Sequence, residues 1–290
     1  MWYDIAMKWL PITLLMLLAF PVSDVLYISQ FPPLISKFPA EESPNNNGPQ
    51  DVEQTTAAVV PQPQTERVPD FSAYLDVAQK KRVFFEFMLP LIRESNANIR
   101  KERSKLMVIS TRLEKGMVLQ RGEHQYLTQL FKRYGMKAPF KVDTQHTDQL
   151  LERVDMVPAS LVLAQSANES GWGTSRFAVK ANNYFGIWCF SSGCGLKPRS
   201  RDEGLSHEIA SYDSVQDSVR AYMHNINTHR AYRDLRLIRS EQRNLQNHYM
   251  GLALTDGLQH YSELGPTYVH AIKQMIRVNK LQEYTLPSSA

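Results

Sequence analysis

The stretch AQSANESGWGTSRFAVKANNYFGIW, residues 164–188, decides the fold. It continues a segment that opens at Pro158 and in which residues 161–164 leave almost no polar face. A proline in the first turn followed by apolar residues all round predicts a central, buried helix. Glu169 falls at the C-terminal end of this helix, where two glycines stop it.

Glu169 has the surroundings of an acid that stays protonated near neutral pH. A carboxylate at the C-terminal end of a buried helix faces the negative end of the helix dipole and apolar neighbours, and both raise its pKa. Cleavage of a glycosidic bond needs such an acid, because the leaving sugar oxygen must receive a proton. The alternative is a surface acid at a helix end, with the glycines as a cap and the aromatics as core.

The residues around Glu169 are of the kinds that bind sugars. Aromatic side chains offer flat apolar faces to sugar rings, and asparagine amides offer donors and acceptors to hydroxyl and acetamido groups. We therefore expect a saccharide groove. Its candidate substrate-binding residues are Trp172, Asn182, Asn183, Tyr184, Phe185 and Trp188.

Two segments of this stretch, AQSANESGWG and ANNYFGI, resemble the signature of the peptidoglycan glucosaminidases, glycoside hydrolase family 73. That signature runs A-Q-x-x-x-E-S-G-W-G and then A-N-N-x-F-G-I. The resemblance covers roughly residues 150–280, and the segments HEIASYDS, NINTH and AYRDLR are similar to the Bax-type exported proteins of that family.

The resemblance implies a mainly α (α+β) fold, a lysozyme-like helical domain with a small β-hairpin lobe. It implies Glu169 as the catalytic acid of an endo-β-N-acetylglucosaminidase that cleaves the GlcNAc-β-1,4-MurNAc bond of peptidoglycan glycan strands. Neither a cofactor nor a metal is expected. A late segment, HYSELGPTYVHAI, matches the family loosely and places Tyr261 as a further catalytic candidate and Tyr268 as a substrate-binding one.

The second carboxylate is left open by the sequence. The acid that the family carries in its β lobe before the turn glycine has no counterpart at that place here. Glu208, in the strand predicted after a turn at residues 202–204, is the stronger candidate, and Glu203, in the turn itself, is the weaker one. The third alternative is that no second protein carboxylate takes part.

The chain of 290 residues divides into three parts. Residues 1–29 contain an apolar run too short for a comfortable membrane span, and we expect either a cleaved signal peptide or a retained membrane anchor, an internal helix being the third alternative. Residues 30–70 are rich in proline and predict a disordered linker. Residues 71–290 predict the helical glucosaminidase domain, with its core at 145–283 and an N-terminal helical extension in which Pro90 kinks or divides the first helix.

The two cysteines, Cys189 and Cys194, are five residues apart in WCFSSGCG. In an exported chain this spacing predicts a disulfide that closes a small loop, with two reduced thiols as the alternative. The surroundings contain no second pair of ligands for zinc.

The net charge of +4 is a mild basic bias, well short of a nucleic-acid binder and suited to an anionic surface or polymer. Arginines 230, 233, 236 and 239 recur at helical spacing, which favours a solvated face or contact with the peptide carboxylates of peptidoglycan. We expect an exported, periplasmic protein, either free or anchored to the inner membrane, and the sequence indicates no oligomeric state.

Two other functions compete with the leading hypothesis. A lytic transglycosylase of related fold also uses one glutamate at the end of a central helix, but FGIW stands here where such enzymes resemble G-L-M-Q. A non-catalytic cell-wall-binding scaffold is the alternative from another class, and the uncertain second acid motivates it.

Overall fold

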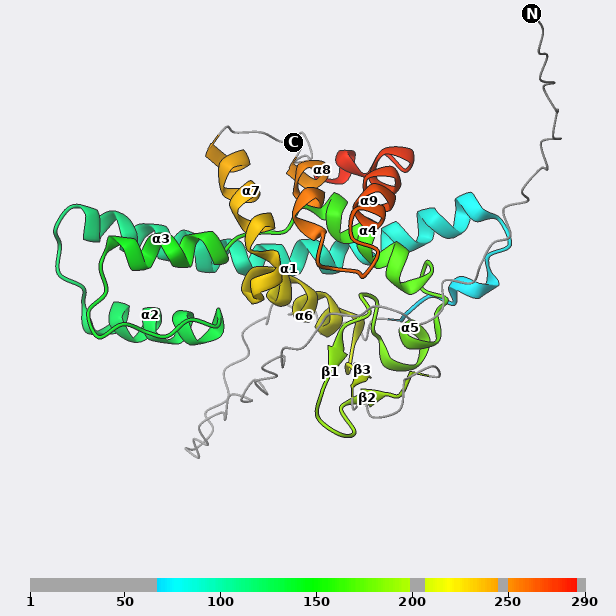
Figure 1. Ribbon diagram of the computed structural model, residues 1–290, viewed down its shortest axis with the longest axis horizontal. Coiled ribbons are helices and arrows are strands. Elements are labelled where there is room, and N and C mark those ends of the chain that lie inside the picture. Colours follow the sequence, from blue (N-terminus) through cyan, green and yellow to red (C-terminus); the bar gives the residue numbers. More distant parts are fainter. Residues whose placement is uncertain (1–66, 199–206, 245–249, 286–290) are drawn as a thin grey trace, which may run out of the picture.

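The computed structural model describes residues 67–198, 207–244 and 250–285, which form a mainly α fold with one small antiparallel sheet (Figure 1). This confirms the predicted fold class. The α-helices are α1 (Val77–Glu114), α2 (Arg121–Arg133), α3 (Thr144–Arg153), α4 (Ala159–Ser170), α5 (Arg176–Ala181), α6 (Val215–Thr228), α7 (Arg233–Asn244), α8 (Met250–Leu254) and α9 (Pro266–Val278). Short 3-10 helices are η1 (Phe71–Ala73), η2 (Arg230–Tyr232), η3 (Thr255–Leu258) and η4 (Leu281–Tyr284).

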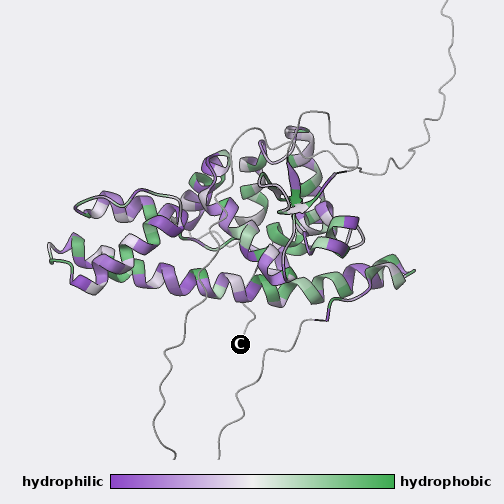
Figure 2. Cartoon of the chain, turned by 90° about the horizontal axis from the view of Figure 1, so that it is seen from below, coloured by the Kyte–Doolittle hydropathy of each residue, from purple (hydrophilic) through white to green (hydrophobic). Residues whose placement is uncertain are grey.

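Helix α1 runs along the length of the molecule (Figures 1 and 2). The Asp76 side chain caps its start by accepting a hydrogen bond from the Gln79 backbone N–H at 2.6 Å. Pro90 does not divide the helix, which is continuous through it. Buried Met88 and Ile92 on either side of Pro90 belong to the main core, and their packing offsets the missing backbone hydrogen bond.

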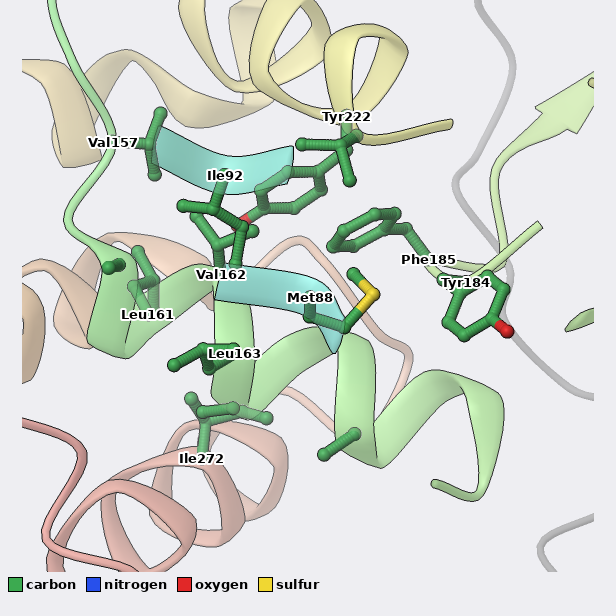
Figure 3. Close-up of a cluster of buried hydrophobic side chains, with 14 of the residues drawn as sticks. Met88, Ile92, Val157, Leu161, Val162, Leu163, Tyr184, Phe185, Tyr222 and Ile272 are labelled. Atoms are coloured by element: carbon green, nitrogen blue, oxygen red, sulfur yellow. The ribbon is translucent and has the colours of Figure 1, made fainter. Parts of the chain in front are cut away.

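Helix α4 lies at the centre of the main hydrophobic core, as its apolar sequence predicts. Every residue from 159 to 167 is buried. Figure 3 shows Leu161, Val162 and Leu163 pointing to different sides of the helix, toward residues of α1, α6 and α9. Because α4 is surrounded on all sides, the position of its last turn is set by the whole core.

The β lobe is a three-stranded sheet rather than the expected two-stranded hairpin. Strands β1 (Trp188–Cys189) and β2 (Gly195–Leu196) both pair antiparallel with β3 (Glu208–Ala210), in the order β1-β3-β2. A side chain at Gly195 would collide with the backbone oxygen of Ile209, since a Cβ there would lie 1.8 Å from it. The glycine therefore permits the close pairing of β2 with β3.

The N-terminal helical extension builds an arm, which we define as residues 100–154 and which comprises the distal part of α1 with α2 and α3 (Figure 1). Helix α3 begins beside the end of α1, since the hydroxyls of Ser110 and Thr147 are hydrogen-bonded at 2.9 Å. The arm has a hydrophobic cluster of its own, separate from the main core. Its buried members are Leu106, Ile109, Leu127, Leu130, Phe131, Tyr134, Val142, Leu150 and Val154.

The predicted arginine face does not exist as a solvated stripe. Arg236 and Arg239 are 2% and 0% exposed, although Arg230 and Arg233 are exposed. Arg239 donates a hydrogen bond to the backbone oxygen of Asp155. The Asp155 carboxylate lies close to Arg239 and also to arginines 103 and 243. These arginines therefore join the arm to the rest of the domain, and burial lowers the pKa of Arg239 to about 10.

None of the helices in the described part of the chain is long and apolar enough to span a bilayer. The predicted signal or anchor segment, residues 1–29, and the linker as far as residue 66 lie outside the described residues. Glu203 lies outside them as well.

Candidate active site

Glu169 sits in the last turn of α4, where the backbone turns sharply away. Gly171 caps the helix with φ of 55°, and Trp172 and Gly173 follow with φ of 60° and 77°. Three successive left-handed residues reverse the chain directly after Glu169, and glycine is the residue that adopts this conformation without strain. The Ser170 hydroxyl braces the turn by donating to the Ser166 oxygen and accepting from the Gly173 N–H.

The N-terminal extension holds this turn in place. Trp172, which adopts the left-handed conformation at a cost, packs edge-on against Phe84 and Phe85 of α1 at 5.6 and 5.4 Å between ring centroids. A Cβ at Gly173 would lie 2.3 Å from the ring of Phe71. The turn that carries Glu169 is thus positioned by residues 71–85, which precede the central helix by about seventy to a hundred residues in the sequence.

The carboxyl group of Glu169 has one oxygen engaged and one left open. Oε1 accepts hydrogen bonds from the Tyr268 hydroxyl at 2.7 Å and from the Asn168 amide at 3.2 Å. Oε2 has no hydrogen-bond partner among the described residues. Burial raises the pKa of Glu169 to about 7, and the two hydrogen bonds oppose this rise. Oε2 is therefore the oxygen that carries the proton near neutral pH.

A chain of hydrogen bonds fixes the direction in which Tyr268 donates. The Tyr222 hydroxyl donates to Gln165 Oε1 at 2.5 Å, and Gln165 Nε2 donates to the Tyr268 oxygen at 2.9 Å. Since the amide already donates to Tyr268, the tyrosine proton is directed to Glu169. Gln165 was missed by sequence reasoning. Its signal was present, because it is a polar residue directly after the apolar run 161–164 and one helical turn before Glu169.

Tyr261 lies behind Tyr268 rather than beside Glu169. The two rings stack at 5.3 Å, and the Tyr261 hydroxyl donates to the backbone oxygen of Phe185 at 2.9 Å. Both tyrosines are buried, and burial followed by the negative charge of Glu169 raises their pKa values well above the ordinary range. They remain neutral hydrogen-bond donors, and Tyr268 is the one that touches the acid.

The two asparagines expected to bind sugar are used inside the scaffold. Asn183 donates to the backbone oxygens of Ile187 and Ala210 and accepts from the backbone N–H groups of Phe185 and Ile187. Its amide has no capacity left for a ligand. Asn182 ends α5 with φ of 50° and donates to the Tyr212 oxygen. The pair shapes the loop that leads into the β lobe.

Most of the aromatic residues expected to line a groove are core. Tyr184 and Phe185 are each 1% exposed, and Figure 3 shows both among the buried side chains. Phe185 stacks on Tyr222 at 4.2 Å, because the loop turns it inward under the β lobe. Trp172 is partly buried against α1. Trp188 keeps partial exposure, and His207 stacks on one face of its ring at 4.0 Å.

Glu208 is enclosed in the β lobe. It is 4% exposed, and its two carboxylate oxygens accept hydrogen bonds from the backbone N–H groups of Gly193 and Gly195. These glycines flank Cys194, which the structure joins to Cys189 by a disulfide, the pairing that the sequence predicts. Instead of facing an open groove, Glu208 holds the disulfide loop against the sheet, because its side chain turns toward β2 and the loop before it.

The same corner holds three groups that could ligate a metal, the two cysteine sulfurs and the Glu208 carboxylate, all within 4.8 Å of one another. Both sulfurs are shared in the disulfide and are not thiolates. The grouping therefore offers a single carboxylate.

Comparison with known proteins adds two findings. The sequence model of the glucosaminidase family, described as mannosyl-glycoprotein endo-beta-N-acetylglucosaminidase, matches residues 144–281. The chain is also 32% identical to "Protein bax" of Escherichia coli (strain K12) over 213 residues. The aligned region covers 73% of this chain and 74% of the relative. No solved structure matches.

Proposed function

Because this chain belongs to the glucosaminidase family, as a Bax-type member of these glycoside hydrolases, we propose that it is an endo-β-N-acetylglucosaminidase that cleaves the GlcNAc-β-1,4-MurNAc bond of peptidoglycan. The observation that carries the proposal is the carboxyl of Glu169, partly buried at a helix end with a pKa of about 7 and one oxygen without a hydrogen-bond partner among the described residues. An exported, periplasmic location belongs to the same proposal, and a disulfide suits an oxidising compartment.

In this mechanism Glu169 Oε2 donates its proton to the glycosidic oxygen as the bond to the anomeric carbon breaks. The leaving sugar departs as an alcohol, and Glu169 becomes a carboxylate. The hydrogen bonds that Tyr268 and Asn168 donate to Oε1 stabilise this charged form. A water molecule then adds at the anomeric carbon and returns a proton to Glu169, which leaves a reducing end.

The positive charge that develops at the anomeric carbon needs a partner. The described part of the β lobe contains one carboxylate, Glu208, and it is committed to two backbone amides. The acetamido oxygen of the cleaved GlcNAc can take this part instead, as in substrate-assisted glycosidases. We therefore propose Glu208 as a residue that stiffens the β lobe, with Glu169 as the only protein acid of the reaction among the described residues.

A second candidate function rests on the same observation. A lytic transglycosylase also operates with one acid, and transfers the 6-hydroxyl of MurNAc to its own anomeric carbon in place of water. The product then has a 1,6-anhydro end that is lighter by one water. The enclosure of Glu208 favours this candidate and the substrate-assisted hydrolase equally, and only the product separates them.

The proposal is tested by loss of the acid. Purified wild-type protein should release soluble fragments from murein sacculi, and Glu169→Gln should lower the rate by at least about 100-fold, the scale of general acid catalysis. Glu241→Gln, at an exposed glutamate of α7, is the matched control and should keep the wild-type rate. Equal clearing by a folded Glu169→Gln variant would exclude Glu169 as the acid, and no clearing by the wild type would favour the non-catalytic scaffold.

A further inference from the structure

The positive charge of the chain is concentrated in one stretch. Residues 100–141, which contain the end of α1 and all of α2, hold 11 lysines and arginines against 3 glutamates, a net charge of +8. Subtraction from the totals of 33 and 29 leaves 22 basic and 26 acidic residues elsewhere, a net charge of −4. With α3 included, the whole arm still carries +6, from 12 basic and 6 acidic residues.

Most of these cations are not used by the fold. Four of the 11 are engaged. Arg103 faces Asp155, arginines 112 and 133 pair with glutamates of the arm, and the Lys105 ammonium lies over the Tyr126 ring, 3.9 Å from its centroid. The other seven are exposed, and none of them forms an ion pair with a described residue. They are Arg100, Lys101, Lys115, Arg121, Lys132, Lys137 and Lys141.

Exposed apolar side chains accompany these charges near the free end of the arm. Met117 and Val118 lie in the turn from α1 to α2, and Phe140 lies shortly before α3, which begins beside the end of α1. Phe140 is fully exposed, with 107% of its reference area accessible, and Val118 is 86% exposed. None of the three belongs to the hydrophobic cluster of the arm or packs against it. We call Met117, Val118 and Phe140 the apolar tip.

We propose that the end of the arm binds the surface of an anionic phospholipid membrane. Lysine and arginine side chains attract anionic headgroups, and exposed apolar side chains enter the boundary between headgroups and acyl chains. A hydrated anionic polymer such as peptidoglycan would neutralise the cations but would leave Phe140 and Val118 in water. A membrane interface takes both groups, and so the combination favours lipid.

This contact places the catalytic domain at a distance from the bilayer. The 15 residues of α1 from Arg100 to its end span about 20 Å at 1.5 Å per residue. In Figure 1 the arm extends to one side, away from the β lobe and the end of α4. The arm would therefore act as a spacer. Its tip would lie on the lipid, and Glu169 would act on peptidoglycan at a distance from the bilayer surface.

The experiment labels the apolar tip in the full chain. Val118→Cys is labelled with a fluorophore that responds to a nonpolar environment, while the cysteines of the β lobe remain in their disulfide. Val278→Cys, at an exposed valine at the end of α9, is the matched control label. Both proteins are mixed with vesicles of phosphatidylglycerol and phosphatidylcholine, with phosphatidylcholine alone, and with purified murein sacculi.

We expect a blue-shifted, brighter signal at position 118 on the anionic vesicles only, and none at position 278. The double variant Lys137→Glu with Lys141→Glu should raise the lipid concentration for half-maximal signal by at least about 25-fold, because each lost cation lowers the affinity by about fivefold. If the N-terminal segment already holds the chain on the vesicle, this variant should still lose the signal at position 118. Arg93→Glu with Arg277→Glu, two exposed arginines outside the arm, is the matched charge control and should keep the signal.

Three results would overturn the proposal. They are an equal signal at positions 118 and 278, a signal at 118 that survives reversal of Lys137 and Lys141, and a response at 118 to sacculi without one to anionic vesicles. The last would assign the arm to the wall polymer. Release of fragments from sacculi is scored separately, so the membrane contact and the proposed activity can fail independently.

Discussion

Glutamine in place of Glu169 should stabilise the folded protein above neutral pH and leave its stability unchanged at acidic pH. Burial raises the pKa of Glu169 from 4.5 to about 7. Between these values the folded chain keeps a proton on Glu169 that the unfolded chain has released, so this group makes the wild type less stable as the pH rises. A difference of about 2.5 pH units at about 1.4 kcal/mol each costs the wild type about 3 kcal/mol above pH 7.

Glu169→Gln removes this cost because the amide does not ionise. Its oxygen can still accept the hydrogen bonds from Tyr268 and Asn168, and its size is nearly that of the acid. The measurement is the free energy of unfolding by urea, for wild type and variant, at several pH values from 4 to 9. The difference between the two should be near zero at pH 4 and approach about 3 kcal/mol in favour of the variant at pH 9.

Subtraction of the two curves cancels the other titrating groups. Glu241→Gln, at an exposed glutamate, supplies the control and should run parallel to the wild type. Parallel curves for Glu169→Gln would refute the reasoning, since they would mean that Glu169 ionises at the same pH in the folded and unfolded chains. A variant that loses stability as the pH rises would contradict the sign of the effect.

Three further substitutions test the surroundings of the acid. Tyr268→Phe removes a hydrogen bond that favours ionised Glu169, so the alkaline limb of the kcat/KM profile should move up by about 1 to 2 pH units, and a downward move would contradict the assigned direction. Glu208→Gln should destabilise the protein by about 1 to 3 kcal/mol in urea, because it weakens the acceptors of two backbone amides, and should keep kcat within about tenfold; a folded but inactive variant would show that Glu208 takes part in catalysis. Asp155→Asn should cost about 3 to 5 kcal/mol of unfolding free energy, because it leaves buried arginines unpaired, and a loss below about 1 kcal/mol would show that these pairs contribute little.

The central helix and its acid could be predicted from the sequence because their signals are local. The apolar run, the proline at its start and the glycines at its end lie within about twenty residues, and the structure forms α4 over that range. The family signature added the expectation of a mainly α fold with a small β lobe, which the structure confirms.

The use of each polar side chain could not be predicted, because it depends on contacts between distant residues. Asn183 meets Ala210, 27 residues later, and Gln165 meets Tyr268, 103 residues later. Arg239 is buried by groups that include Asp155, 84 residues earlier. Composition indicates that a side chain can bind sugar or water, but only the packing shows whether its hydrogen bonds are already used.

The same reasoning explains why the role of the N-terminal extension was missed. Phe71 and Trp172 are both ordinary apolar residues in the sequence, and their common position around the turn after Glu169 becomes visible only in the fold. The aromatics of the signature segment similarly divide into buried residues, such as Phe185, and partly exposed ones, such as Trp188. A sequence pattern of aromatic residues does not show which of them are buried and which remain partly exposed.

The most direct test of the central claim is the chemical nature of the sugar ends that the protein releases. Murein sacculi are digested with the purified protein, the fragments are reduced with borohydride, and their masses are measured. Hydrolysis after GlcNAc through Glu169 predicts reduced glucosaminitol ends that are absent with Glu169→Gln. Muramitol ends would identify a muramidase, and 1,6-anhydro ends, lighter by one water, would contradict hydrolysis and establish the transglycosylase.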